Sequence, residues 1–378
     1  MLIKRRPNSL GADIPETNKP MARTFAFYLP QYYPTPENDV WWGKGFTEWT
    51  NVGRAKPLFR GHYQPRVPAD LGYYDLRIPE VRVQQAEMAK ACGIEGFCYW
   101  HYWFGGQRLL DRVFAEVLSS GSPDYPFCLC WANHSWKAKT WDPSIPDKML
   151  MEQTYPGPED YRQHFLAMLP AFKDKRYIRV EGRLLFGIFE PGDIPNMEEM
   201  AQIWNTLAAE NGLPSFYFFA FAQGAGTLEK ARRAGFDKVV YDALFDAVYL
   251  HHHAISYRVK AKINSWFNRP SPLPYDFYAH VAIEKFHQYP ETIPCIDPNF
   301  DHSPRSGARG TIVDNSTPEK WGLLCNKAAR YVESKNGNDL LFIKSWNEWG
   351  EGNYLEPDLR FGTRYLEETA KALNKDNH

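Results

Sequence analysis

Long apolar runs are absent from the sequence. The longest apolar block, residues 216–222, has the length of a β-strand, and none approaches the roughly 18 residues of a membrane-spanning helix. The basic residues at positions 4–6 could begin a secretion signal, but no apolar segment follows them. We therefore predict a cytoplasmic protein without a membrane span.

Paired cysteine motifs are absent as well. The six cysteines lie mostly inside apolar stretches, at positions 92, 98, 128, 130, 295 and 325, and no Cys-x-x-Cys occurs. This pattern favours buried free thiols in a reducing compartment over a disulfide framework or a zinc site.

The common signatures of cofactor chemistry are also missing. The chain has no Gly-x-Gly-x-x-Gly, no Walker phosphate loop and no His-Glu-x-x-His. It also lacks Asp-x-Asp, the metal–nucleotide motif of one large class of glycosyltransferases. The three histidines at 251–253 have no matching carboxylates or cysteines nearby in the sequence. We therefore expect no cofactor and no metal.

Neither sign of charge is in excess, whereas aromatic residues are abundant. Lys and Arg number 44 against 45 Asp and Glu, which argues against a nucleic-acid or membrane-surface partner. The 378 residues include 13 Trp, 22 Tyr and 24 Phe, more than core packing usually needs.

Short β-rich apolar runs recur along the chain, at 24–29, 95–100, 127–131, 184–189, 216–221, 238–242, 293–297 and 341–346. They are continuous rather than alternating, which is typical of parallel strands buried on both faces. Helical patterns separate or follow them at 79–92, 107–119, 158–172, 197–211, 226–234, 276–288, 317–332 and 361–373. This alternation predicts one (β/α)8 TIM barrel over 23–378 with long loops after the strands. Residues 1–22 are predicted to be a polar tail, and 243–275 an irregular insertion.

In a TIM barrel the loops after the strands form the functional face. Ten of the 13 tryptophans lie at or just after predicted strand ends, at 41, 42, 49, 100, 103, 131, 136, 141, 346 and 349. Flat aromatic faces beside carboxylates and amides suit a sugar, because its C–H faces stack on rings and its hydroxyls need directional polar partners. We therefore expect a glycan or oligosaccharide partner.

Two glutamates follow the last predicted strand. Glu348 and Glu351 are three residues apart on one turn, so their Cβ atoms can lie roughly 5–6 Å apart. Retaining glycosidases need two carboxyls about 5–5.5 Å apart, which this spacing allows. A Glu-x-x-Glu is commonly a solvated helix face, but Trp346 and Trp349 enclose this one. We predict that both glutamates are catalytic and open into a pocket walled by aromatic side chains.

The remaining candidates are loop side chains that could contact the substrate: Tyr28, Gln31, Glu48, Trp49, Tyr99, His101, Tyr102, Trp131, Asn133, Trp136, Glu190, Asp301, Arg305, Trp346, Asn347 and Trp349. Some have structural alternatives. His101 could cap a strand, and Asp301 with Arg305 could equally form a structural ion pair. Asn133 begins an Asn-x-Ser sequon, but without a secretion signal a hydroxyl contact is the better interpretation.

Several strings resemble those of the WbsX-like family, which is related to glycoside hydrolase family 99. They are Phe-Tyr-Leu-Pro-Gln at 27–31, the tryptophan-rich stretch 41–52, Gly-His-Tyr-Gln-Pro at 61–65, Gly-Phe-Cys-Tyr at 96–99, Cys-Trp-Ala-Asn at 130–133 and Trp-Asn-Glu-Trp-Gly-Glu-Gly at 346–352. The resemblance covers about residues 24–370 and implies a (β/α)8 barrel without metal. It leaves the activity open, because members carry both hydrolase and transferase labels.

Family 99 contains endo-α-1,2-mannosidases and mannanases that act with retention through a 1,2-anhydro sugar. The resemblance implies that Glu348 deprotonates the substrate's 2-hydroxyl and that Glu351 is the general acid/base on the glycosidic oxygen. The sequence departs from the family at His134-Ser135, where relatives commonly have Glu-Asn, and at Glu190, where they often have Arg. Both departures predict altered substrate contacts in the same pocket.

Together these features predict a retaining glycoside hydrolase acting on an α-linked, mannose-like glycan. Two other functions remain open. One is a glycosyltransferase of O-antigen (lipopolysaccharide) or capsular polysaccharide biosynthesis that uses the same carboxylate pair, and the other is a non-catalytic glycan-binding barrel. Binding of a nucleotide sugar would favour the transferase, and turnover of any glycan would exclude the non-catalytic barrel.

Overall fold

The computed structural model describes residues 22–138, 148–253, 270–335 and 340–374. The predicted polar tail at 1–22 therefore lies almost entirely outside the described residues, and so does Trp141.

Eight parallel strands form a closed barrel, so the predicted TIM barrel is confirmed. In chain order they are β1 (Arg23–Tyr28), β2 (Gly96–His101), β5 (Phe127–Trp131), β9 (Arg183–Ile188), β10 (Phe216–Gln223), β11 (Lys238–Asp242), β13 (Ile293–Ile296) and β15 (Leu340–Ile343). Each pairs with the next, and β15 pairs with β1 to close the ring. A short strand, β8 (Arg179–Val180), adds to β9 in antiparallel fashion. Closure leaves the eight barrel strands without an open edge.

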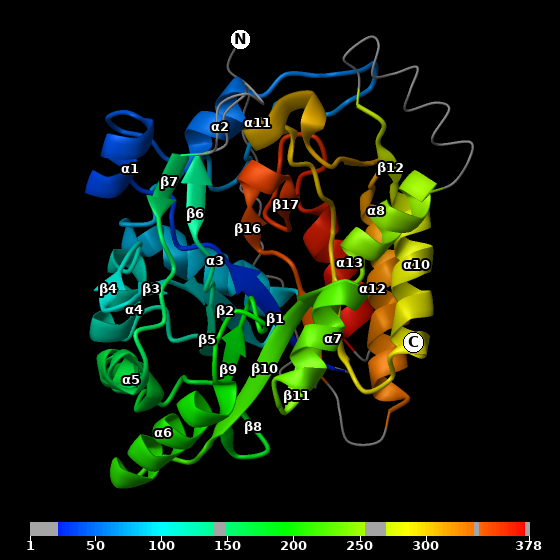
Figure 1. Cartoon of the computed structure of the whole chain (residues 1–378). Helices are drawn as coiled ribbons and strands as arrows, with labels where there is room; N and C mark the ends of the chain where they lie inside the picture. The colour runs from blue at the N-terminus through cyan, green and yellow to red at the C-terminus, as the bar shows by residue number, and fades with distance from the viewer. Residues whose placement is uncertain (1–21, 139–147, 254–269, 336–339, 375–378) are drawn as a thin grey trace.

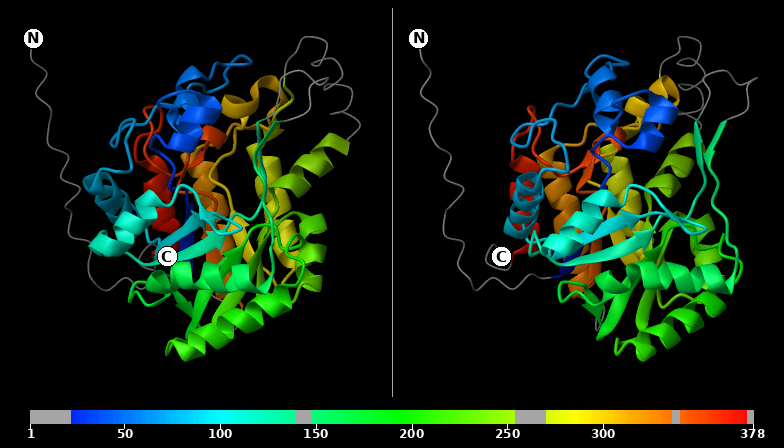
Figure 2. Two further views of the ribbon diagram at one scale, coloured as in Figure 1. Left: turned by 60° about the vertical axis from the view of Figure 1, so that its left-hand side comes forward. Right: turned by 90° about the vertical axis from the view of Figure 1, so that its left-hand side faces the viewer.

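Eight helices surround the barrel (Figures 1 and 2): α3 (Pro79–Ala91), α4 (Arg112–Ser120), α5 (Pro158–Phe172), α6 (Met197–Glu210), α7 (Ala225–Arg233), α10 (Tyr275–Gln288), α12 (Pro318–Glu333) and α13 (Arg364–Leu373). Local sequence features mark the start of four of these helices. The helices α3, α5 and α12 begin with proline, and the Asn196 side chain caps the N-terminus of α6. None of the helices among the described residues is long and apolar enough to cross a membrane. The six cysteines are buried and free, as predicted.

Two segments differ from the prediction. The interval 243–275 was expected to be irregular, but Leu244–His253 forms α8, while 254–269 lies outside the described residues. The helix expected from 107 begins at Arg112, because β3 (Trp103–Phe104) and β4 (Gln107–Arg108) form a hairpin before it. Gly105 and Gly106 supply the positive φ angles of 51° and 95° at that turn.

The loops after the strands gather at one end of the barrel. They contain α1 (Pro36–Trp42), α2 (Glu48–Arg54), α11 (Ser303–Ser306), a 3-10 turn at Gly307–Arg309, and the hairpins β6 (Trp136–Ala138)–β7 (Lys148–Met151) and β16 (Asn347–Glu348)–β17 (Asn353–Tyr354). A further pair, β12 (Leu273–Pro274) with β14 (Val313–Asp314), lies beside them. Figure 1 shows α2, α11, β16 and β17 close together at the upper end, so residues far apart in sequence meet there.

The pleat of the strands separates an interior from an outer layer. Phe27 and Trp100 face the barrel interior, where their rings stack at 4.5 Å. Their neighbours face the helices: the Tyr28 hydroxyl donates to Gln85 of α3 at 2.7 Å, and the Tyr99 ring contacts Phe114 of α4. Successive strand residues point to opposite sides, so only one of each aromatic pair can reach the interior.

Candidate active site

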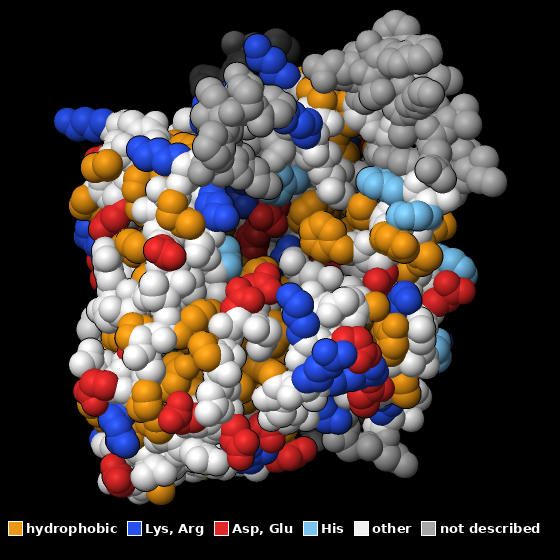
Figure 3. Space-filling view, viewed as in Figure 1, with side chains coloured by type: hydrophobic (Ala, Val, Ile, Leu, Met, Phe, Trp, Pro, Cys, Tyr) orange, Lys and Arg blue, Asp and Glu red, His pale blue; other side chains and the backbone are white. Residues whose placement is uncertain are grey.

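The β16–β17 hairpin positions the two glutamates at the end of the eighth barrel strand. Glu348 is the last residue of β16, and Glu351 ends the 3-10 turn Trp349–Glu351. Gly352, at φ +57°, reverses the chain so that Glu348 pairs with Asn353 of β17. Figure 3 shows acidic side chains inside a recess at the place where Figure 1 shows β16.

Glu348 is buried and hydrogen-bonded. Its side chain accepts at Oε1 from the Trp100 indole Nε1 at 2.7 Å and from the Ser345 hydroxyl at 3.0 Å, and the residue is 5% exposed. Burial, followed by the nearby charge of Glu351, raises the pKa of Glu348 to about 7. Glu348 is therefore largely protonated at slightly acidic pH.

Glu351 lies between two cations. Arg305 Nη1 donates to Oε1 at 2.6 Å, and Lys344 Nζ lies 3.5 Å from Oε2. Burial alone would raise the pKa of Glu351, but Lys344 and Arg305 outweigh it and hold the pKa well below its usual range. The two glutamates therefore have pKa values shifted in opposite directions, with Glu348 raised and Glu351 lowered.

Arg305 connects Glu351 to the first loop. Its Nε donates to Glu48 Oε2 at 3.1 Å, and Gln31 Nε2 donates to the other Glu48 oxygen at 3.3 Å. Gly350 permits this approach, since a Cβ there would collide with the Glu48 carboxylate and lie 3.1 Å from Arg305 Nε. The structure therefore brings Gln31, Glu48 and Arg305 to the glutamate pair, and their contact with a substrate stays a prediction.

Three more predicted residues lie close to the pair. Burial and then the charge of Glu348 raise the pKa of Tyr102, so its hydroxyl lies within the field of the carboxylates. The half-buried Trp136 meets the Tyr102 ring edge-on at 5.0 Å. Burial lowers the pKa of His134, and the charge of Glu351 opposes that shift, which places His134 near Glu351.

The expected aromatic walls are part of the core instead. Tyr99, Trp131, Trp346 and Trp349 are at most 3% exposed. Trp349 stacks on Tyr354 at 3.7 Å, Trp131 donates from Nε1 to a backbone carbonyl, and Tyr99 faces the helical layer. These side chains do not line a pocket around the glutamates, because close packing of the loops on the barrel has covered them.

Two predicted asparagines hold the loops together. The Asn347 amide accepts from Leu29 N at 2.7 Å and donates to Leu29 O at 3.1 Å. Asn133 accepts from Glu190 N at 2.8 Å and donates to Glu190 O at 2.9 Å. Both amides are therefore engaged with backbone rather than directed toward a ligand.

Several other candidates have their hydrogen-bond or charge partners outside the pair. Tyr28 faces α3, and His101 Nε2 lies 2.8 Å from His164 Nε2 of α5, where burial lowers the pKa of His101 to about 3. Trp49 donates to Tyr74 O at 2.7 Å. Burial and the charge of Asp193 raise the pKa of Glu190, while the charge of Lys230 lowers it. Neither glutamate of the pair is among these causes.

Asp301 does not pair with Arg305. It accepts instead from His62 Nε2 and Gln64 Nε2, both at 2.7 Å, and Arg305 binds Glu48 and Glu351. The ion pair between Asp301 and Arg305 that the sequence left open therefore does not form, and the two residues belong to separate networks.

Sequence reasoning missed Trp100, Ser345 and Lys344, which contact the glutamates directly, and Tyr32. The Tyr32 hydroxyl donates to Asn347 O at 2.6 Å and accepts from Trp349 N at 2.9 Å, which supports the turn. A signal existed for Lys344, because a lysine at the end of an apolar strand is rarely buried without a charged partner. Among the described residues, no group of three or more His, Cys, Asp or Glu side chains could hold a metal ion.

Comparison with known sequences identifies the family. The model of a family described as "Glycosyltransferase WbsX" matches residues 24–369. The uncharacterized protein WxcX of Xanthomonas campestris pv. campestris, found in two strains, is 35% identical over 369 residues. That alignment covers 96% of this chain but 51% of WxcX, so the chain spans about half the length of these curated relatives.

Solved structures are similar in fold. A glycoside hydrolase-like protein superposes with a TM-score of 0.61 at 14% identity, covering 96% of both chains. The GH99 endo-alpha-mannosidase from Bacteroides thetaiotaomicron gives a TM-score of 0.56 at 16% identity, covering 92% of this chain and 95% of that enzyme. At these identities the likeness concerns the fold alone. The family match over residues 24–369, with the relationship to WxcX, shows that this chain belongs to the WbsX glycosyltransferase family.

Proposed function

We propose that this protein is a carbohydrate-active enzyme that cleaves an α-linked, mannose-like glycan with retention, using Glu348 and Glu351. The observation that carries the proposal is the pair of carboxyls at the end of the eighth strand, that of Glu348 buried and that of Glu351 partly buried, whose pKa values are shifted in opposite directions. A pair with one proton is what a reaction needs when one group must give a proton and the other must take one.

The roles follow the resemblance to family 99. Glu348 takes the proton of the substrate's 2-hydroxyl as that oxygen attacks the anomeric carbon. Glu351 gives a proton to the glycosidic oxygen as the bond to the leaving group breaks. Water then opens the 1,2-anhydro ring, with Glu351 accepting a proton from the water and Glu348 returning one to the 2-hydroxyl.

This assignment runs against the two shifts in the free protein, which favour a proton on Glu348 over one on Glu351. The surroundings of Glu351 must therefore change when the substrate binds. Arg305, after Lys344, is the second-largest charge that lowers the pKa of Glu351. A glycan hydroxyl that draws Arg305 away would therefore raise that pKa and favour a proton on Glu351.

A glycosyltransferase is the second candidate, favoured by the description of the family. The same pair would then deprotonate an acceptor hydroxyl while a sugar leaves its donor. Titration with nucleotide sugars separates the two functions, because a hydrolase of this kind has no need of the nucleotide.

The decisive experiment compares two variants on substrates with good and poor leaving groups. Protonation matters most for a poor leaving group, whereas the 2-hydroxyl must be deprotonated in every case. Glu351→Gln should lose about 10²–10⁴ in rate on a glycan but keep much of its activity on an aryl glycoside. Glu348→Gln should lose activity on both.

Glu210→Gln at the exposed end of α6 is the matched control and should be unaffected. Equal losses on both substrates for both variants would remove the division of roles. Full activity of either variant would refute the site.

A further inference from the structure

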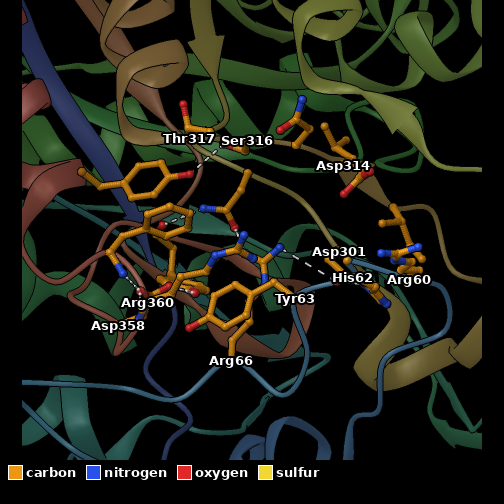
Figure 4. A pocket seen from close by; sticks show the side chains of 18 residues that line it. Arg60, His62, Tyr63, Arg66, Asp301, Asp314, Ser316, Thr317, Asp358 and Arg360 are labelled. Atoms are coloured by element: carbon orange, nitrogen blue, oxygen red, sulfur yellow. Dashed lines mark hydrogen bonds and ion pairs between the residues drawn. The ribbon is translucent and has the colours of Figure 1, made fainter.

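A cavity of about 280 Å³ lies beside the candidate active site, and the proposed reaction does not use it. Its walls come from the loop after β1 (residues 60–66), the loop after β13 (299–317) and the segment after β17 (354–365). Figure 4 shows side chains converging on it from these segments. Neither Glu348 nor Glu351 lines it.

A buried polar network holds one wall in place. Asp301 accepts from His62 and Gln64, and Arg66, 9% exposed, donates from Nη1 to Gly352 O at 2.9 Å and to Asn299. Side chains supported in this way keep their positions without a ligand, which lowers the entropy cost of binding one.

The lining combines aromatic rings with polar groups. The Tyr63 and Phe361 rings lie 6.2 Å apart and nearly perpendicular, and Arg360 lies over both. Ser316 and Asp314 supply oxygen atoms at the cavity. The formal charges cancel, since three guanidinium groups face three carboxylates, from Arg60, Arg66, Arg360, Asp301, Asp314 and Asp358. A neutral ligand with many hydroxyls and apolar ring faces suits such a lining.

The cavity has room for one sugar ring. A cavity of about 150 Å³ is enough to hold benzene. The 280 Å³ here therefore leaves room for a six-membered ring with its hydroxyl substituents.

The cavity is connected to the catalytic turn through backbone hydrogen bonds. Asp301 N donates to Glu351 O at 2.6 Å, and Arg66 binds the next carbonyl, that of Gly352. The wall of the cavity and the turn that carries Glu351 therefore form one hydrogen-bonded unit.

We propose that this cavity is a carbohydrate-binding subsite for one neutral pyranose residue, separate from the glutamate pair. The choice of a sugar as ligand rests in part on the proposed function. Binding, however, can be measured without turnover, so the two proposals can fail independently.

The test uses the full chain with methyl α-D-mannopyranoside as the neutral probe and glucuronate as the charged one. Crystals soaked with the mannoside should show the ring in this cavity. In solution, Tyr63→Ala and Asp314→Ala should each weaken mannoside binding by about tenfold, which corresponds to about 1.4 kcal/mol. Tyr331→Ala, which removes a half-buried tyrosine of α12 outside the cavity, is the matched control and should bind as the wild type does.

An empty cavity in the soaked crystal would overturn the subsite, and so would unchanged binding in both Tyr63→Ala and Asp314→Ala. Binding of glucuronate in preference to the mannoside would overturn the assignment to a neutral sugar. A bound pyranose in a protein that turns over no glycan would uphold the subsite and refute the proposed reaction.

Discussion

Replacing Trp100 by phenylalanine should reveal which proton role Glu348 performs. The indole Nε1 donates to Glu348 Oε1 at 2.7 Å, and Glu348 is 5% exposed. Hydrogen bonds to charged groups contribute about 1.5–3 kcal/mol. One pKa unit corresponds to about 1.4 kcal/mol, so the loss of this donor should raise the pKa of Glu348 by about one to two units. The new ring would retain the stacking on Phe27.

The assay is the pH dependence of kcat/KM on an activated aryl α-glycoside. If Glu348 must be ionised to act as a base, activity rises as the pH passes its pKa of about 7. The Trp100→Phe variant should then move this rising limb upward by about one to two pH units. If Glu348 instead acts as the acid, the falling limb measured on a glycan with a poor leaving group moves. We expect the rising limb to move.

Trp103→Phe is the control, because this buried tryptophan donates to Asp160 at 3.1 Å, away from the pair. Its pH profile should match that of the wild type. If Trp100→Phe also leaves both limbs in place while the protein stays folded, Glu348 is not the titrating group, and the reasoning from its environment is refuted.

Two other substitutions test the contacts around Glu351. Gly350→Ala introduces a Cβ against the Glu48 carboxylate and Arg305, which should lower the free energy of unfolding by about 1–3 kcal/mol and lower kcat by separating Arg305 from its partners. Gly53→Ala, in open space on α2, is the control and should leave both activity and Tm nearly unchanged. Equal kcat values for the two variants would contradict the role of the Glu48–Arg305 contact. Lys344→Met removes the buried cation beside Glu351, Asp297 and Asp242, and thermal denaturation should show a loss of about 3–5 kcal/mol. Lys320→Met, which breaks a more exposed ion pair with Asp276, is the control and should lower the free energy of unfolding by at most about 1 kcal/mol. Similar losses for the two variants would show that Lys344 does not neutralise buried carboxylates.

The strands and helices could be predicted because their signals are local. The continuous apolar runs gave barrel strands whose ends differ from the predicted ones by at most three residues, as at β15, which ends at Ile343 rather than 346. Proline and capping residues marked the starts of α5 and α12 in the same way. Segment 243–275 was misread because α8 does not begin with proline and ends in the three histidines at 251–253, which carry no apolar pattern.

The sequence could not predict which aromatic side chains of the strands point into the barrel and which point toward the helices. In a strand buried on both faces, every residue is apolar, so the sequence carries no period of two that would distinguish the inside from the outside. Tyr28 and Tyr99 were therefore chosen as site residues, although the pleat directs them to the helices and places Phe27 and Trp100 in the interior.

By itself, the sequence determined the barrel, the family and the position of Glu348 and Glu351 at the end of the last strand. Those features depend on short stretches of chain and on strings of neighbouring residues. Only the tertiary structure decided the charge state of the pair and the partners that set it. Glu48 and Arg305 are 257 positions apart and meet at Glu351 only because closure of the barrel brings the first and seventh loops beside the eighth. Burial and opposing charge act through space, so the separate pKa values of two glutamates three residues apart are a property of the folded chain.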